Sequence, residues 1–275
     1  MKPLNPDKVE TLQRLYTATE TIPVVLLGAF ARDLLFYHLH GVEVPRATKD
    51  IDTSVQMKSW ENFNAICRKL LELGFHNKKP NHPEKFTDTN GQEVDMLPFG
   101  SLSEDGKTIT WPADNSPWTI SAIQEAYDHA LLFRQAAFEF RIIPPAAMIY
   151  LKIFSTCDRP HDRKKKDSAD INFVLTNYLV ATGKGRLKSS GSDGDIMEKV
   201  KGDLDRAAAW LAGRDMASIV SAQTAGDLSG LLRKETEGTS LCPIAHELAN
   251  YHEGKFARSR EILKSLRDGF EEARK

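Results

Sequence analysis

The stretch from Ile22 to Val55, IPVVLLGAFARDLLFYHLHGVEVPRATKDIDTSV, constrains the fold of this chain more than any other part of it. An apolar run ends at Gly28, which can supply a tight turn. A helical pattern follows over residues 29–38, and a glycine and a proline end it before an acidic strand at residues 50–56. The stretch therefore predicts a buried strand, a glycine turn, a helix and a second strand.

Asp50 and Asp52 stand two positions apart at the start of the second strand. Alternation along a strand places both carboxylates on one face and Ile51 on the other. Two carboxylates on one strand face pack poorly, but they are good ligands for a divalent cation. Together with the turn at Gly28, this pair is typical of a site that holds a nucleoside triphosphate with magnesium.

A third carboxylate follows in a predicted hairpin. Residues 85–97 contain an Asn-Gly pair between two strand-like arms, which is a strong hairpin signal. Asp95 lies between two apolar residues of the second arm, so it faces away from them and can share a face with Asp50 and Asp52. Three such carboxylates can hold two Mg²⁺ ions about 3.5–4 Å apart. Asp95 can also accept the proton of an attacking hydroxyl.

The pattern changes from mixed strands and helices to mainly helices after about residue 110. It predicts an α+β protein with a catalytic domain at residues 1–115 and a mostly helical domain at 116–275. A Gly/Ser/Lys-rich stretch near 181–195 predicts a flexible linker. Residues 59–74 give the clearest amphipathic helix, with Ser59 as its N-cap.

Composition narrows the class of protein. The chain has 275 residues, 41% hydrophobic and 27% charged, which is typical of a soluble globular protein. It has no apolar run near the roughly 20 residues that span a membrane, and its first residues lack the apolar core of a signal peptide, so we expect a cytoplasmic protein with no membrane partner. Three scattered cysteines argue against a disulfide framework and against structural zinc.

Charge leaves one local question open. The net charge of −1 gives the whole chain no strong attraction for nucleic acid. The basic cluster at residues 159–166 could bind phosphate, or it could be a solvated loop.

The motifs of the first half resemble the nucleotidyltransferase superfamily typified by DNA polymerase β. The resemblance rests on LLGAFARDLL, then R-x-T-x-D-I-D, then E-V-D-M-L-P-F-G, and it is similar to the minimal nucleotidyltransferases that include the AbiE-type (AbiEii) toxins. It implies a nucleotidyltransferase fold, a small mixed sheet with flanking helices, and a helical domain that completes the nucleotide site. It also implies Mg²⁺ or Mn²⁺, an NTP substrate, transfer of an NMP to an acceptor hydroxyl with release of pyrophosphate, and an unfused antitoxin partner.

The stretch I-P-P-A-A-M-I-Y-L-K, then D-R, then K-D-x-x-D, fits the second half of that family. The resemblance implies that Lys152 contacts the triphosphate, and that two aspartates at i, i+3 order the lysine or approach the nucleotide. The expected nucleotide-binding residues are Gly28, Ala29, Arg46, Thr48, Lys152, Asp167 and Asp170, and the expected catalytic and metal-binding residues are Asp50, Asp52 and Asp95. A surface arginine at Arg46 and a snorkelling lysine at Lys152 are the alternatives for those two positions.

Several interpretations remain open at the level of sequence. The acceptor could be RNA or tRNA, a protein, or a small molecule. Ala29 stands where the family usually has glycine or serine, so a catalytically silent relative that binds nucleotide or a partner protein is a further alternative. Arg32-Asp33 resembles a signature of tRNA nucleotidyltransferases, but their E-D-x-x-R motif is not found downstream, and a salt bridge that braces the glycine turn explains the pair as well.

Overall fold

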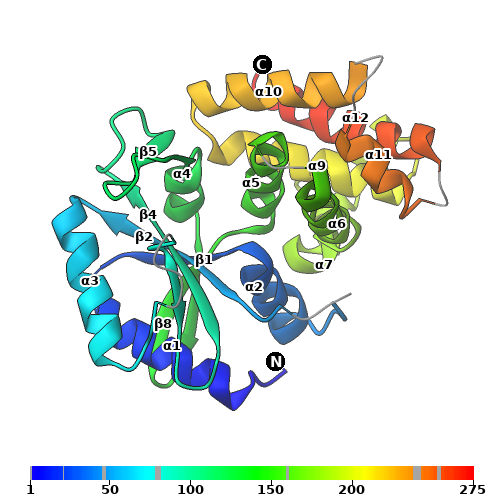
Figure 1. Cartoon of the computed structure of the whole chain (residues 1–275). Coiled ribbons are helices and arrows are strands. Elements are labelled where there is room, and N and C mark those ends of the chain that lie inside the picture. Colours follow the sequence, from blue (N-terminus) through cyan, green and yellow to red (C-terminus); the bar gives the residue numbers. More distant parts are fainter. Residues whose placement is uncertain are drawn as a thin grey trace. The chain divides into compact units, whose positions relative to one another are not determined.

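The structure is a computed structural model, and it describes residues 2–20, 22–44, 48–77, 82–158, 161–237, 243–252 and 255–275. Of residues 157–158 and 161–164 it describes the backbone alone. The chain forms two compact units, Met1–Pro144 and Pro145–Lys275, called unit 1 and unit 2 (Figure 1).

Unit 1 is built on a mixed β-sheet. Its strands are β1 (Val24–Leu27), β2 (Ile51–Met57), β3 (Lys85–Thr87), β4 (Glu93–Gly100), β7 (Leu131–Gln135) and β8 (Phe138–Ile142). They form one six-stranded sheet in the order β3-β4-β2-β1-β8-β7. β1 runs antiparallel to β2, whereas β2 and β4 are parallel, as are β1 and β8. This arrangement places the two acidic strands, β2 and β4, side by side.

Helices cover this sheet. They are α1 (Pro6–Thr19), α2 (Gly28–Asp33), the π-helical turn η1 (Leu34–Leu39), α3 (Trp60–Glu72) and α4 (Ile123–Asp128). α1 and α3 contact each other on one side of the sheet, and α2 lies on the other side (Figure 1). Ser59 caps α3 by accepting the N–H of Asn62 at 3.3 Å, as the sequence predicts.

The predicted hairpin is confirmed between β3 and β4. In its antiparallel register Lys85 is the partner of Asp95. The Asp88 carboxylate closes the turn by accepting the backbone N–H groups of Asn90 at 2.8 Å and Gln92 at 2.9 Å. The turn therefore fixes which residue of β3 lies beside Asp95.

A small second sheet, β5 (Thr108–Thr110) and β6 (Pro117–Thr119), belongs to the same unit. The buried Trp111 ring follows β5 and lies 5.0 Å from the ring of Trp60, 5.6 Å from Phe63 and 6.0 Å from Trp118. This aromatic cluster joins the small sheet to α3.

The described residues of unit 2 form helices joined by turns and loops, without a strand. Its elements are α5 (Pro145–Asp158), α6 (His161–Thr176), α7 (Tyr178–Thr182), the 3₁₀ turn η2 (Lys184–Leu187), α8 (Ile196–Lys199), α9 (Leu204–Ile219), α10 (Ala222–Glu237), α11 (Pro243–Ala249) and α12 (Phe256–Glu272). α9 and α12 pack with their backbones in close approach. A β-carbon at Gly213 would lie 2.0 Å from the Leu266 carbonyl oxygen, and one at Gly269 would lie 2.1 Å from the Trp210 carbonyl oxygen. Only glycine fits at either position.

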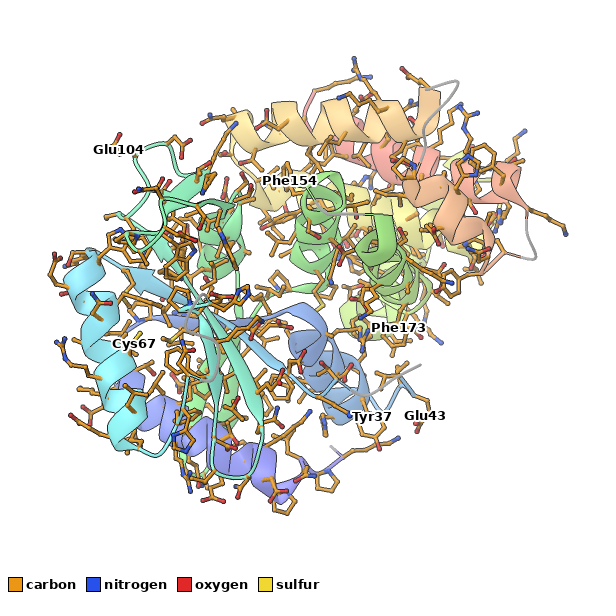
Figure 2. The ribbon with its side chains drawn as sticks, viewed as in Figure 1. Tyr37, Glu43, Cys67, Glu104, Phe154 and Phe173 are labelled. Carbon is orange, nitrogen blue, oxygen red and sulfur yellow. The ribbon has the colours of Figure 1, made fainter. Side chains whose placement is uncertain are left out.

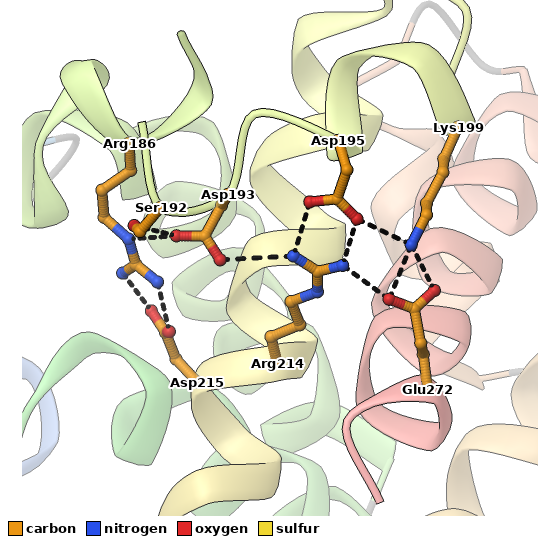
Figure 3. Close-up of polar contacts among 8 residues, drawn as sticks. All are labelled: Arg186, Ser192, Asp193, Asp195, Lys199, Arg214, Asp215 and Glu272. Carbon is orange, nitrogen blue, oxygen red and sulfur yellow. Dashed lines mark hydrogen bonds and ion pairs between the residues drawn. The ribbon is translucent and has the colours of Figure 1, made fainter. Parts of the chain in front are cut away.

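Arg186, on η2, anchors the segment that follows α7 (Figure 3). Its guanidinium donates two hydrogen bonds to Asp215 of α9, at 2.9 and 2.8 Å, and one to Asp193 at 2.8 Å. The Tyr178 hydroxyl also donates to Asp215, at 2.7 Å. Bidentate arginine–carboxylate pairs of this kind fix geometry as well as charge.

A second arginine, Arg214 on α9, continues the network (Figure 3). Arg214 donates to Asp195 at 2.6 Å and to Glu272 of α12 at 2.5 Å. Residues of the stretch near 181–195 are therefore bonded to α9, and the predicted flexibility of this stretch stays a prediction. The contacts are made by Arg186, Asp193 and Asp195, and not by the glycines, serines and lysines that gave the stretch its linker-like composition.

The predicted fold class is confirmed: a small mixed sheet with flanking helices is followed by a helical unit. The predicted boundary at residue 115 is placed too early, because β8 pairs with β1 and unit 1 ends at Pro144. None of the helices in the described ranges is both long enough and apolar enough to cross a membrane.

Candidate active site

Three charged side chains form a row across three adjacent strands of unit 1. Asp52 of β2 is the register partner of Asp95 of β4, and Asp95 is the register partner of Lys85 of β3. Register partners share one face of a sheet, and neighbouring strands lie about 4.8 Å apart. The prediction that Asp95 faces the same side as Asp52 is therefore confirmed.

Gly28 lies directly against this row. It follows β1, whose last residue Leu27 is the register partner of Asp52. Gly28 has φ +65°, and a β-carbon there would lie 2.1 Å from Oδ2 of Asp52. The glycine is required both by its left-handed backbone and by the carboxylate that takes up the space of a side chain. The predicted turn and the predicted carboxylate thus form one structural feature.

Lys85 is a residue of this row that the sequence analysis did not single out. Its ammonium forms an ion pair with Oδ2 of Asp95, and each of the two side chains is 31% exposed. Partial burial would lower the pKa of Lys85, but the hydrogen bond to Asp95 and the charges of Asp95, Glu84 and Asp52 raise it overall. The signal for Lys85 was present in the sequence, because the Asn-Gly turn fixes the hairpin register.

Asp50 takes a different position from the row. It lies in a bend just before β2 and is exposed. The preceding segment is anchored through Thr48, whose backbone N–H donates to Asp33 at 3.0 Å and whose carbonyl oxygen accepts from Lys8 at 2.7 Å. Thr48 itself is buried. Arg46, the other predicted residue of this segment, lies outside the described residues.

The Arg32-Asp33 ion pair is buried at the end of α2. Arg32 donates from Nε to Oδ1 of Asp33 at 2.9 Å, and Oδ2 of Asp33 accepts the backbone N–H of Thr48. The two residues are 2% and 6% exposed. The ion pair itself lies within α2, and the Asp33 carboxylate ties α2 to the segment before β2 through the Thr48 N–H. Ala29, also a predicted nucleotide-binding residue, is buried in the same helix.

The carboxylates of unit 1 suit a divalent cation in part. Carboxylate oxygens are the ligands that Mg²⁺ and Mn²⁺ prefer, and Asp52 and Asp95 stand on neighbouring strands of one face. Two negative charges at about 5 Å repel each other by roughly 3 kcal/mol at an effective dielectric constant of about 20, so a cation between them is favourable. Within the described residues, however, no three His, Cys, Asp or Glu side chains are grouped closely enough to hold a metal ion. The structure thus brings Asp52 and Asp95 together but not the full set with Asp50.

In unit 2 the structure brings together three other predicted residues. Nζ of Lys152 on α5 lies 2.7 Å from Oδ1 of Asp167 and 2.9 Å from Oδ2 of Asp170, both on α6. Ser155 also donates to Asp167, at 3.1 Å. Burial would lower the pKa of Lys152, but the charges of Asp170 and Asp167 raise it overall. The two aspartates order the lysine, and its contact with a nucleotide stays a prediction.

Unit 1 has two large cavities. The one beside Asp50 has a volume of about 810 Å³, and Lys8, Tyr37, Glu43 and Gln92 contribute to its lining. Tyr37 belongs to η1 and Glu43 to the segment after it (Figure 2), and Lys2 contacts both side chains. Single π-helical turns are frequent at functional sites. This cavity adjoins Asp50, a predicted catalytic residue, and also the π-helical turn η1.

The other cavity, of about 760 Å³, lies at the opposite ends of β2 and β4. Its lining includes Gln56, Met57, Phe99 and Gly100 and none of the predicted site residues.

No protein-family model matches the chain. No curated protein matches it either. Among solved structures, it is similar to the antibiotic-resistance factor ANT(2'')-Ia, with a TM-score of 0.37 and 15% identity over 72% of this chain and 95% of that one. It is also similar to an antigenic nucleotidyltransferase-like protein from Paracoccidioides brasiliensis, with a TM-score of 0.43 and 18% identity over 75% of this chain and 94% of that one. Both TM-scores are low, and neither similarity establishes a function for this chain.

Proposed function

We propose that the chain is a metal-dependent nucleotidyltransferase, which moves an NMP from an NTP to an acceptor hydroxyl and releases pyrophosphate. The observation that carries the proposal is the placement of Gly28 against Asp52, with Asp95 next to Asp52 on the same face of the sheet. The order of strand, glycine turn, helix, acidic strand and second acidic strand supports the same class of enzyme.

Asp52 and Asp95, with Asp50, would hold Mg²⁺ or Mn²⁺, which supplies charge neutralisation for the triphosphate and for the developing negative charge. The absence of a side chain at Gly28 lets the Asp52 carboxylate lie directly against the turn, and the backbone N–H groups of Gly28 and Ala29 are proposed to bind the triphosphate. Arg46, Thr48, Lys152, Asp167 and Asp170 are proposed to contribute to nucleotide binding.

In the proposed reaction the acceptor oxygen attacks the α-phosphorus of the NTP. The bond between that phosphorus and the bridging oxygen breaks, and pyrophosphate leaves with the electron pair. Asp95 accepts the proton of the acceptor hydroxyl. Because the transferred group undergoes little covalent assistance, catalysis depends mainly on positioning and electrostatic stabilisation.

The experiment is incubation of the full chain with each α-³²P-labelled NTP, Mg²⁺, total RNA and cell lysate. Label in RNA, in protein or in a small molecule identifies the acceptor class, and the matched control is Asp52→Asn. This change keeps the size of the side chain next to Gly28 and removes its charge. We expect transfer to fall by at least about 10³-fold, as in the loss of a group that stabilises transition-state charge. Equal labelling by both proteins would contradict the proposal.

A specific observation favours a second candidate, a silent relative that binds nucleotide without turnover. Asp95 is engaged by Lys85, and the three predicted carboxylates are not grouped as a metal site within the described residues. Calorimetry with each NTP and Mg²⁺ separates the two functions. Binding without any transferred label would support the silent relative and exclude the enzyme.

Toxin activity is a narrower proposal, which rests on the resemblance to AbiEii-type proteins. It predicts growth arrest on expression, relieved by Asp52→Asn and by a cognate antitoxin. If the protein labels an acceptor in vitro but cells that express it grow normally, the nucleotidyltransferase proposal stands and the toxin proposal is excluded.

A further inference from the structure

Lys85 forms an ion pair with one carboxylate of the acidic row, which consists of Asp52 on β2 and Asp95 on β4. Elsewhere in unit 1, Lys2 pairs with Glu43, Arg14 with Glu10, Arg32 with Asp33 and Arg134 with Glu139, and none of these carboxylates belongs to the acidic row. Lys85 instead pairs with Asp95, the neighbour of Asp52 on the same face of the sheet. Its ammonium therefore supplies positive charge where the proposed metal would supply it.

The position of Lys85 is fixed by the backbone and not by a flexible loop. Lys85 and Asp95 are register partners in the hairpin closed by Asp88. Both side chains are about two-thirds covered, so water screens the pair less than it would screen a fully exposed one. The charge of Asp52 acts on the same ammonium. One lysine thus partly neutralises both carboxylates of the row.

A buried carboxylate, Glu84, precedes Lys85 in the chain. The side chain of Glu84 is 4% exposed, and in the part of the chain that the structure describes neither of its oxygens accepts a hydrogen bond. Nδ1 of His82 lies 3.3 Å from one of them, and the charge of Glu84 acts on Lys85. Glu84 therefore adds to the negative charge around the Lys85 ammonium.

We propose that Lys85 is a built-in counter-cation of the acidic row, which a divalent metal must displace from Asp95 in order to bind Asp52 and Asp95 together. The inference rests on the proposed function, because it assumes that this row is the metal site. Lys85 is a positioning residue: it holds Asp95 in place without metal, and it sets how tightly metal binds. In the exchange one Asp95 oxygen passes from the ammonium to the metal, and no covalent bond changes.

The test is Mn²⁺ binding to the full chain, with Mn²⁺ alone as the probe, followed by electron paramagnetic resonance of the free ion. Lys85→Met removes the competing charge and keeps the length of the side chain, so we expect Mn²⁺ to bind about threefold to tenfold more tightly. Lys85→Arg, which keeps the charge, should bind like the wild type. The matched control is Lys69→Met, an exposed lysine at the end of α3.

The effect must depend on Asp95. In an Asp95→Asn background, Lys85→Met should no longer change the affinity for Mn²⁺, because the carboxylate for which the lysine competes is absent.

The outcomes separate the inference from the proposed function. If the wild type binds Mn²⁺ and Lys85→Met binds it no more tightly, the inference is overturned and the proposed function stands. If neither protein binds Mn²⁺, the metal site of the proposed function is overturned as well.

A measurement on the unaltered chain covers the case in which Lys85→Met does not fold. The NMR signal of the Lys85 side chain should shift on addition of Mg²⁺, and an unchanged signal at saturating metal would overturn the inference.

Discussion

Units 1 and 2 each contain one lysine with two aspartates, and the two sets differ in burial. In unit 2, Lys152, Asp167 and Asp170 have side chains 20%, 1% and 5% exposed, and the lysine contacts both aspartates. In unit 1, the side chains of Lys85 and Asp95 are each 31% exposed. Asp52 acts on Lys85 through electrostatic attraction. The same residue types therefore form a buried support in one unit and an accessible row in the other.

The elements that carry the two sets explain the difference. Asp167 and Asp170 share one face of α6 and point toward Lys152 on α5, so helix packing removes all three groups from water. The acidic row lies on β-strands, where register places the groups side by side on a face that only partly buries them. A buried set of charges stabilises the fold as long as it is complete, whereas an accessible set can exchange partners.

The largest expected effect is on the buried set. Lys152→Met should lower the free energy of unfolding of unit 2 by about 3–5 kcal/mol, because it leaves two buried carboxylates without their lysine. Hydrogen exchange in peptides of α5 and α6 measures the change, and Lys166→Met, an exposed lysine of α6, is the matched control. Unchanged protection of α5 and α6 would show that the lysine does not support the unit.

The next effect concerns the turn that touches the accessible row. Gly28→Ala should cost about 2–5 kcal/mol, from the left-handed backbone and from the contact with Asp52. Gly91→Ala is a matched control, since Gly91 has φ +79° but nothing lies within 4 Å of the added β-carbon. Chemical unfolding followed by tryptophan fluorescence measures both. Equal losses for the two variants would mean that Asp52 yields to the new methyl group.

Removal of the accessible lysine should affect stability much less. Lys85→Met should change the free energy of unfolding of the metal-free protein by no more than about 1 kcal/mol, because an ion pair that is partly exposed to water contributes little to stability. Urea unfolding of this variant beside Lys69→Met measures it. A loss as large as that for Lys152→Met would erase the distinction between the two sets.

The smallest effect is expected at alkaline pH. The pKa of Lys152 is raised by its aspartates, so its contribution to stability is complete below the unfolded value of about 10.4 and is lost as the pH rises through the folded value. The stability difference between the wild type and Lys152→Met should therefore shrink above about pH 10.4. Urea unfolding at a series of pH values from 9 upward measures it, and a difference that grows with pH would have the wrong sign.

Local sequence patterns were sufficient for several elements of the fold. The Asn90-Gly91 turn, the cap at Ser59 and the glycine at Gly28 each follow from backbone preferences of a few residues. The grouping of Lys152 with Asp167 and Asp170 followed from a family resemblance and from helical spacing. These are features whose cause lies within a short stretch of chain.

Features that depend on long-range contacts were missed. The pairing of β8 with β1 moved the boundary between the units to Pro144, and no local pattern near residue 115 carries that information. Arg186 and Asp193 lie in a stretch with the composition of a linker, and their partners Asp215 and Arg214 are on α9. Lys85 is a different case, because the register of the local hairpin, which makes it the neighbour of Asp95, could have been worked out from the Asn-Gly turn.

The close approach of Gly28 to Asp52 also restricts how related chains can change over evolution. A side chain at position 28 could be accommodated only if position 52 became smaller, and a smaller residue than aspartate there has no carboxylate. The two positions should therefore vary together among relatives. A relative with another residue in place of Gly28 should also lack the carboxylate of Asp52. The residue at position 28 would then indicate which relatives have lost the proposed metal-binding carboxylate.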